Sequence, residues 1–320
     1  MLRTGTGRWE HEDGASYEGE WKDGEFSGYG KYIWEDGRVY EGQWLDDKSN
    51  GQGKTTFTDG ETYEGEWKDD DYSGYGKLIC EDGRVYEGEF KDDKANGQGK
   101  ITYTDGETYE GEWKDDDYSG QGKQIKPDGE TYEGGWKEGN RHGQGKIVLP
   151  IGEAYEGEWK DDLPNGKGKY TWPDGCIYEG EYKDYKKEGQ GKMIYANGDV
   201  YEGQWKDDNS HGIGRISLAN GQTYEGEWKD DKYHGKGKYT QSDGCIYEGE
   251  WKDDMAQGTG RFTFENGEYQ EGQYESGNPI GVFKYFSKEG KLIKLITFED
   301  GEVVKEEEVV KKGLGIISKS

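Results

Sequence analysis

The feature that most restricts the fold of this chain is a repeat of 23 residues. The triplet Tyr-Glu-Gly occurs eleven times, and successive copies begin 23 residues apart, from Tyr17 to Tyr247. An altered copy follows, with Gln270 in place of the tyrosine. The string DGETYEGEWKDDDYSG begins at Asp59 and again at Asp105, which indicates that pairs of repeats were duplicated. A fixed period of this length indicates an array of small units that stack on their neighbours, because one unit cannot bury a core alone.

The composition of the chain argues against an ordinary layered domain. Only 29% of the 320 residues are hydrophobic, and 57 are glycine, so the supply of aliphatic side chains is too small for a core between two layers. The chain nevertheless has 12 Trp, 26 Tyr and 8 Phe, whereas disordered chains are poor in aromatic residues. We therefore expect an ordered chain in which packed rings take the place of a second layer.

Each repeat predicts two short β-strands. In the segment Tyr-Glu-Gly-Glu-Trp, the Tyr, Gly and Trp side chains share one face of a strand and the two Glu side chains share the other. The second strand is expected to run from a Gly-x-Gly pair to an Asp-Gly turn, as in Gly28 to Trp34. The Lys-Asp-Asp-x-x-x segment that links the two strands is polar and predicts a turn.

The side chains also predict how the strands pair. We expect three pairs between the first two strands of the array: Trp21 with Gly28, Gly19 with Gly30 and Tyr17 with Tyr32. A three-residue loop, Glu35-Asp36-Gly37, with its glycine in the left-handed conformation, continues this pairing to the next strand. On the other face, this pairing places acid and base alternately, in the row Glu18, Lys31, Glu41, Lys54, Glu64, Lys77. A shift of the pairing by one residue would destroy the pattern on both faces of the sheet.

The pattern YEGEWKDxxxxGxGxxxxxDG resembles the MORN repeat (membrane occupation and recognition nexus), from about residue 5 to residue 284. The resemblance implies an all-β fold, an elongated single-layer antiparallel meander of tandem 23-residue β-hairpin repeats. Known members include scaffolds of cilia and parasite cytoskeletons, membrane-junction proteins, and accessory regions of lipid kinases and lysine methyltransferases.

Two regions are predicted. Residues 1–284 form an array of about 12 repeats, and residues 285–320 form a C-terminal cap or tail. Met1 to Trp9 resemble the second strand of an earlier repeat, so the first repeat is partial. Val282 to Phe298 are expected to add strands that protect the open end of the sheet, and Gly301 to Ser320 to form a last strand or a helix. Dimerisation through this end, as in some family members, stays open as the alternative to capping.

No motif predicts catalysis, a cofactor or a metal site. The Gly-x-Gly pairs lack the strand–loop–helix context of a phosphate-binding loop. His142, His211 and His234 occur at most one to a repeat, too far apart to share a metal directly. The Asp-Asp pairs, as at 46–47, lack the spacing of a calcium-binding loop and are expected to be solvated edge charge, although weak divalent binding stays open. Enzymes that resemble this family carry a separate catalytic domain, and about 36 residues beyond the repeats cannot hold one.

The candidate binding site is the aromatic face. Rings of a single-layer sheet are covered from one side only, and exposed aromatic side chains are typical interaction anchors. We expect a groove for a partner segment, extended or helical, although rings that only fill the sheet's own concavity stay open as the alternative. The candidate residues are the tyrosine of each triplet and the aromatic residue four positions later: Tyr17, Trp21, Tyr40, Trp44, Tyr63, Trp67, Tyr86, Phe90, Tyr109, Trp113, Tyr132, Trp136, Tyr155, Trp159, Tyr178, Tyr182, Tyr201, Trp205, Tyr224, Trp228, Tyr247 and Trp251.

Charge and resemblance together suggest the function. A net charge of −28 repels nucleic acid and anionic bilayers, so we expect protein partners, no nucleic acid and no direct membrane binding. The leading hypothesis is a non-enzymatic scaffold of a cytoskeletal or ciliary assembly, because the chain resembles axonemal, radial-spoke-type proteins of the family. The alternative is a membrane-apposition adaptor that contacts phosphoinositides, although the chain has no basic cluster for it. Three unpaired cysteines and an N-terminus without an apolar segment predict a cytoplasmic location.

Overall fold

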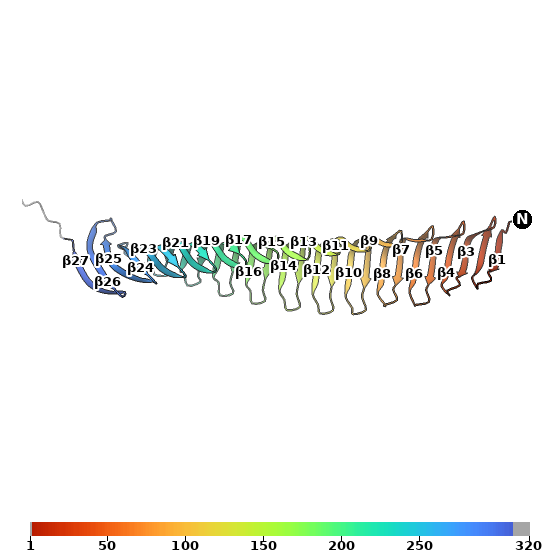
Figure 1. The fold of residues 1–320 in the computed structure, drawn as a ribbon, viewed down its shortest axis with the longest axis horizontal. Coiled ribbons are helices and arrows are strands. Elements are labelled where there is room, and N and C mark those ends of the chain that lie inside the picture. Colours follow the sequence, from red (N-terminus) through yellow and green to blue (C-terminus); the bar gives the residue numbers. More distant parts are fainter. Residues whose placement is uncertain (1, 310–320) are drawn as a thin grey trace, which may run out of the picture. The chain divides into compact units, whose positions relative to one another are not determined.

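A computed structural model describes residues 2–309, and every regular element in that range is a β-strand. In each of the two units into which the chain divides, the strands follow one another in chain order (Figure 1). Their bounds are β1 Gly5–Glu10, β2 Ser16–Lys22, β3 Glu25–Ile33, β4 Val39–Leu45, β5 Lys48–Thr56, β6 Thr62–Lys68, β7 Asp71–Ile79, β8 Val85–Lys91, β9 Lys94–Thr102, β10 Thr108–Lys114, β11 Asp117–Ile125, β12 Thr131–Lys137, β13 Asn140–Val148, β14 Ala154–Lys160, β15 Leu163–Thr171, β16 Ile177–Lys183, β17 Lys186–Ile194, β18 Val200–Lys206, β19 Asn209–Ser217, β20 Thr223–Lys229, β21 Lys232–Thr240, β22 Ile246–Lys252, β23 Met255–Thr263, β24 Tyr269–Glu275, β25 Asn278–Phe286, β26 Leu292–Glu299 and β27 Glu302–Glu308.

The strands form the all-β, antiparallel sheet that the repeat predicts. They belong to one sheet of 27 strands, and they divide into two compact units, one ending at Pro164 and the other beginning at Asn165. Within each unit, a strand pairs with the strand before it and the strand after it, as β3 pairs with β2 and β4. Pairing between sequence neighbours explains why a period in the sequence becomes a period in the structure.

The predicted register is confirmed across the Asp-Gly loops. Gly28 faces Trp44 and Tyr32 faces Tyr40 between β3 and β4. The loop that joins these strands is closed by a hydrogen bond from the Trp34 amide to the Arg38 carbonyl, at 2.9 Å, and Gly37 has a φ of 87°. This is the three-residue loop with a left-handed glycine that the sequence predicts.

The register across the Asp-Asp turns is only partly as predicted. Tyr17 does face Tyr32, but Trp21 faces Phe26, and the prediction that it faces Gly28 was wrong. A β-bulge causes the difference, because Gly28 adopts a left-handed φ of 64° and displaces the backbone beside it. The side chain of Glu20 accepts a hydrogen bond from the Tyr29 amide at 3.1 Å and so satisfies a donor that the bulge removes from the ladder.

The Lys-Asp-Asp-x-x-x segment is also shorter as a turn than predicted. Leu45 pairs with Lys48, so the turn between β4 and β5 consists of two residues, Asp46 and Asp47. Both have positive φ, 51° and 62°, which is the combination that a type I′ hairpin turn requires. The second strand of each repeat therefore begins at this turn, three residues before the first glycine of the Gly-x-Gly pair.

Glycines let a tyrosine ring lie on the backbone of the sheet. A Cβ atom at Gly30 would lie 2.3 Å from the Tyr17 hydroxyl, and a Cβ at Gly19 would lie 2.4 Å from the Gly30 Cα. Both distances are far below van der Waals contact, so neither position accepts a side chain while the ring stays in place. Glycine at these two positions therefore makes the slot that the tyrosine ring fills.

The other face of the sheet carries the predicted row of alternating acids and bases, which we call the charged face. Glu41 lies opposite Lys31 on one side and Lys54 on the other. Lys54 forms an ion pair with Glu64 at 3.2 Å, and Lys77 forms one with Glu87 at 2.6 Å. Because these groups are about half exposed, each pair adds only a few tenths of a kcal/mol, but together they favour one register.

The two ends depart from the repeat in different ways. β1 pairs with β2 in the repeat's own register, with Gly7 opposite Gly19, as expected for the second strand of a repeat. Near the other end, Gln270 provides no ring, and Phe283 replaces the second glycine of the pair. The Phe283 ring is fully buried. A Cβ atom added to Gly272 would lie only 2.4 Å from this ring, so the ring fills the space that a tyrosine fills elsewhere.

Further strands follow the repeats, as predicted. Phe283, Ile296 and Phe298, from β25 and β26, form an apolar cluster with two tyrosines of the preceding repeats. β27 pairs with β26, so the segment after residue 300 begins as a strand. The predicted boundary between residues 284 and 285 falls inside β25. Residues 310–320 lie outside the described residues, and the capping role stays a prediction.

The indole of Trp113 tests the packing of the repeat. Its exposed fraction is 6%, and its Nε1 donates to the Gly99 carbonyl at 3.0 Å. We expect Trp113→Ala to lower the free energy of unfolding by about 3 kcal/mol or more, because it removes a large buried ring. Trp113→Phe is the matched control, since Phe90 occupies the same position one repeat earlier, and it should lower stability by only about 1 kcal/mol.

Urea-induced unfolding, followed by the circular dichroism of the sheet, measures both changes. A loss below about 0.5 kcal/mol for Trp113→Ala would show that the ring is not packed as described.

Candidate binding face

The candidate aromatic residues gather on one face of the sheet, which we call the tyrosine face. The tyrosine of each triplet is almost completely buried, as Tyr40 is with 0% exposed, and the aromatic residue four positions later is buried too, as Trp44 is with 6% exposed. Of the 22 candidate residues, Trp251 alone is only half-buried. The structure therefore brings the candidates together, but below the surface that a partner would meet.

The rings form a continuous edge-to-face chain along the sheet of each unit. The Tyr40 ring lies 5.0 Å from Trp44 of its own strand, at 88°, and 5.1 Å from Trp67 of the following repeat, at 81°. Edge-to-face pairs of this kind stabilise by about 0.5–1.5 kcal/mol beyond their burial. Each tyrosine thus joins two repeats, and this contact replaces the second layer of an ordinary domain.

The polar atoms of these rings are satisfied within the framework. The Tyr40 hydroxyl donates to the Gln43 carbonyl at 2.8 Å, and the Trp44 Nε1 donates to the Gly30 carbonyl at 3.2 Å. Both contacts recur from repeat to repeat. Burial raises the pKa of the triplet tyrosines, for Tyr17 to about 12, because the charged phenolate is poorly solvated there. These hydroxyls therefore act as donors that position backbone, and they are not free to bind a ligand.

A second row of side chains lies over the tyrosines, and it alternates between large and small residues from Phe26 to Tyr118. These residues stand two positions before each Gly-x-Gly pair. In the first unit, they begin with Phe26, Ser49, Tyr72, Ala95 and Tyr118. The large rings stack flat on the tyrosine of the preceding strand, with centroids 3.9 Å apart for Phe26, 3.7 Å for Tyr72 and 3.6 Å for Tyr118. Ser49 and Ala95 place no ring on the tyrosine of the preceding strand, which nevertheless stays buried, as Tyr40 does.

Sequence reasoning missed this second row. Its signal is present, because the duplicated string that begins at Asp59 and Asp105 contains Tyr72 and Tyr118 at the same position. The expected register placed Gly28 and not Phe26 opposite Trp21, so these side chains were not expected on the tyrosine face.

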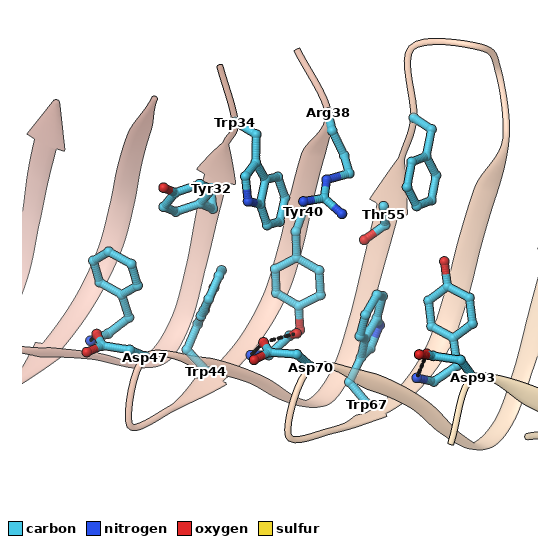
Figure 2. Close-up of a pocket in the computed structure, with 14 residues that line it drawn as sticks. Tyr32, Trp34, Arg38, Tyr40, Trp44, Asp47, Thr55, Trp67, Asp70 and Asp93 are labelled. Carbon is cyan, nitrogen blue, oxygen red and sulfur yellow. Dashed lines mark hydrogen bonds between the residues drawn. The ribbon is translucent and has the colours of Figure 1, made fainter. Parts of the chain in front are cut away.

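A pocket of about 560 Å³ opens on the tyrosine face where small residues replace large ones. It lies between Phe26 and Tyr72, over Ser49 and Thr55. Figure 2 shows Trp34 and Arg38 at one end of it, and Asp47, Asp70 and Asp93 in a row at the other. The full lining is Phe26, Tyr32, Trp34, Arg38, Tyr40, Trp44, Asp47, Ser49, Thr55, Phe57, Trp67, Asp70, Tyr72 and Asp93.

The aspartates beside the pocket bind neighbouring backbone. The carboxylate of Asp70 accepts from the Ser49 amide at 2.8 Å and from the Ser49 hydroxyl at 2.9 Å, and the Asp70 amide donates to the Ser49 carbonyl at 3.1 Å. Asp47 and Asp93 hold Phe26 and Tyr72 in the same way. These aspartates are exposed at the edge, as expected, but the second aspartate of an Asp-Asp turn also has a role that the sequence did not indicate. It links its turn to the strand 21 residues earlier, as Asp70 does to Ser49.

Among residues 2–309, no group of three or more His, Cys, Asp or Glu side chains is placed to hold a metal ion. Nor does that part of the chain contain a helix with the length and apolar character to cross a membrane.

Comparison with protein families agrees with this architecture. The family described as MORN repeat matches eleven consecutive segments: 17–37, 40–62, 63–83, 86–108, 109–131, 132–153, 155–177, 178–200, 201–223, 224–246 and 247–269. The chain belongs to the MORN repeat family. The MORN repeat is a non-enzymatic scaffold repeat. No curated protein matches the chain.

Solved structures of other proteins resemble the chain only weakly. The TCP10 domain of Danio rerio CPAP is 13% identical, with 76% of this chain and 98% of that domain covered and a TM-score of 0.27. The TCP domain of Drosophila melanogaster SAS-4, solved with a proline-rich motif of Ana2, is 10% identical, with 63% and 90% covered and a TM-score of 0.25. A streptogramin B lyase is 13% identical, with 83% and 92% covered and a TM-score of 0.15. Scores this low carry no functional argument.

The second aspartate of each turn can be tested at Asp116. Its carboxylate accepts from the Ala95 amide at 2.8 Å, and its own φ is 73°. We expect Asp116→Ala to lower the free energy of unfolding by about 2 kcal/mol, because it leaves a donor unpaired and puts alanine in a left-handed conformation. Asp116→Asn keeps the oxygen and tolerates this φ, so it should stay within about 0.5 kcal/mol of the wild type. Equal losses for both variants in urea-induced unfolding would contradict the assigned role.

The buried tyrosines predict loss of stability at high pH. An exposed tyrosine in the unfolded chain ionises near pH 10, whereas burial raises the pKa of Tyr17 to about 12 and raises the others in the same direction. The stability that each contributes is fully present below about pH 10 and is lost as the pH rises through the folded value.

We expect ionisation of the buried tyrosines, measured by ultraviolet absorbance, to coincide with the loss of aromatic circular dichroism above about pH 10. Independent titration of these tyrosines near their ordinary pKa, with the fold intact, would refute their burial.

Proposed function

We propose that this chain is a non-enzymatic scaffold that binds other proteins through its tyrosine face. The observation that carries the proposal is the division of this face into a constant framework and a variable surface. The framework rings, as at Tyr40 and Trp44, are buried and hydrogen-bonded to backbone in nearly every repeat. The residues over them change from repeat to repeat, as Phe26, Ser49 and Tyr72 do. A constant support with variable side chains suits recognition of a particular partner along several repeats.

The candidate residues then have a supporting role. The tyrosine and indole rings hold the face in shape, and the residues above them meet the partner. Side chains of this second kind include Tyr32, Trp34 and Phe57, which line the pocket. Aromatic side chains at a hollowed surface are the usual anchors of protein recognition.

We place this scaffold in a cytoskeletal or ciliary (axonemal) assembly of the cytoplasm. The support for this location is the resemblance of the chain to such members of the family. The partners are proteins, in accord with the net charge of −28. A homodimer through the C-terminal strands remains the alternative to a cap at that end.

A membrane-apposition adaptor has weaker support. The lysines of the charged face stand between glutamates, and Lys54 and Lys77 each form an ion pair with one of them. Paired lysines do not offer phosphoinositides the free cluster of bases that attracts them.

Photo-cross-linking in the native cells tests the proposal. The photoreactive residue p-benzoylphenylalanine replaces Phe57 on the tyrosine face, or, as a matched control, Tyr75 on the charged face, where the ring is 62% exposed. We expect cross-links to a partner protein from position 57 and few from position 75, because the partner lies over the variable side chains of the tyrosine face.

Fractionation of the cross-linked cells with non-ionic detergent then tests the location. A scaffold of the cytoskeleton stays in the insoluble pellet with its cross-linked partner. Release with solubilised membranes would favour the adaptor instead, and cross-linking from position 75 alone would refute binding by the tyrosine face.

A further inference from the structure

We propose that the pocket between Phe26 and Tyr72 is the anchor site of the tyrosine face. Its occupant is a basic segment of a protein partner, in which one bulky apolar side chain fills the pocket and flanking Lys or Arg side chains reach the aspartates. The inference rests on the proposed function and adds to it a location and the chemistry of the partner.

The pocket exists because two small residues coincide. Ser49 occupies the position that carries a ring at Phe26 and Tyr72, and Thr55 occupies the position that carries Tyr32 one repeat earlier. The side chains of Ser49 and Thr55 are buried, with 6% and 2% exposed, and they form the floor of the pocket. No other repeat of the sequence combines a small residue at both positions. At Ala95, for example, the partner position is Ile101.

The walls of the pocket are apolar and aromatic. Trp34 and Phe57 stand on the side of the Asp-Gly loops, and the rings of Phe26 and Tyr72 stand two repeats apart along the sheet. Its volume of about 560 Å³ lies within the range of about 300–1,000 Å³ that is typical of binding pockets. An aliphatic or aromatic side chain with its adjoining backbone suits these walls.

Arg38 supplies an unused donor at one end of the pocket. Its guanidinium lies 3.9 Å from the centre of the Trp34 ring, and its Nε is buried without a hydrogen-bond partner. Arg84, at the same position two repeats later, donates its Nε to Asp82 at 2.7 Å. A buried donor that stays unpaired is unfavourable, so a rotation of the Arg38 side chain that brings this N–H to a backbone carbonyl of the incoming segment is favoured.

The other end of the pocket is acidic. Asp47, Asp70 and Asp93 stand in a row there, and each holds neighbouring backbone through one carboxylate oxygen, Oδ1. The second oxygen of each carboxylate is not used in these bonds. In a chain with a net charge of −28, this row favours Lys or Arg side chains and repels an acidic segment.

Peptide selection tests the inference on the full chain. A phage library of random linear peptides of about 12 residues is long enough, because about 6 extended residues cross the two repeats between Phe26 and Tyr72. We expect the selected peptides to share one bulky apolar residue flanked by Lys or Arg. Synthetic versions are measured by fluorescence anisotropy, beside versions in which every Lys and Arg is replaced by Glu.

Two matched variants locate the binding. Ser49→Tyr fills the pocket with the residue that Tyr72 provides at the same position, and it should weaken the selected peptides by about tenfold or more. Ser210→Tyr makes the same change in the second unit, where Ser210 also bonds to an aspartate, Asp231, and it should change affinity by less than about twofold. Thr55→Tyr fills the pocket from the other residue of its floor. This variant replaces Ser49→Tyr in the binding measurement if Ser49→Tyr disturbs the fold.

Each outcome separates the inference from the proposed function. Equal affinities for the wild type, Ser49→Tyr and Thr55→Tyr would overturn the anchor site, while binding itself would still support the scaffold. Equal binding of the Glu-substituted peptides would overturn the basic partner. A library that yields no binder overturns the inference as well, and the proposed function then depends on cross-linking from position 57 alone.

Discussion

The structure depends on a tyrosine ring that lies flat over a row of glycines. A Cβ atom added to Gly122 would lie only 2.3 Å from the Tyr109 hydroxyl, and this arrangement recurs in repeat after repeat. The ring excludes water from the strand beneath it, its hydroxyl bonds to backbone, and its edges meet two tryptophans, Trp113 and Trp136. A sheet with one buried face and no second layer can be stable on these terms, because the rings themselves form the layer.

The same constraint leaves the turns little freedom. Since the rings occupy the centre of the face, the two strands of a repeat are joined at its margin by a turn of two left-handed residues, as at Asp46 and Asp47. The second aspartate, as at Asp70, binds both the amide and the carbonyl of the residue opposite the tryptophan. Aspartate suits this place because it tolerates positive φ and carries an acceptor at the right reach. Part of the strong negative charge of the chain therefore has a structural origin.

Recognition can change without loss of the framework. The residues over the tyrosines contribute packing but hold few of the obligatory hydrogen bonds, so Phe26, Ser49 and Tyr72 can differ at one position. Duplication of repeat pairs makes large and small residues alternate, and a pocket forms where two small residues meet. The proposed anchor site is thus a consequence of variation on a fixed support, beside an acidic margin that the turns require.

The sequence by itself determined the repeat, its two strands, the loop at Gly37 and the alternating row of Glu18, Lys31 and Glu41. These features follow from local rules, because side chains alternate along a strand and a loop of given length sets one register. The family could be recognised from the same residues.

Only the tertiary structure decided what lies opposite Trp21. The bulge at Gly28 is accompanied by a hydrogen bond from the Tyr29 amide to the side chain of Glu20 on the neighbouring strand. The bond from Asp70 to Ser49, 21 residues away, and the pocket over Thr55 likewise arise from contacts between strands. No local pattern encodes these contacts, because they depend on the exact spacing of backbone that the packed rings impose on the sheet.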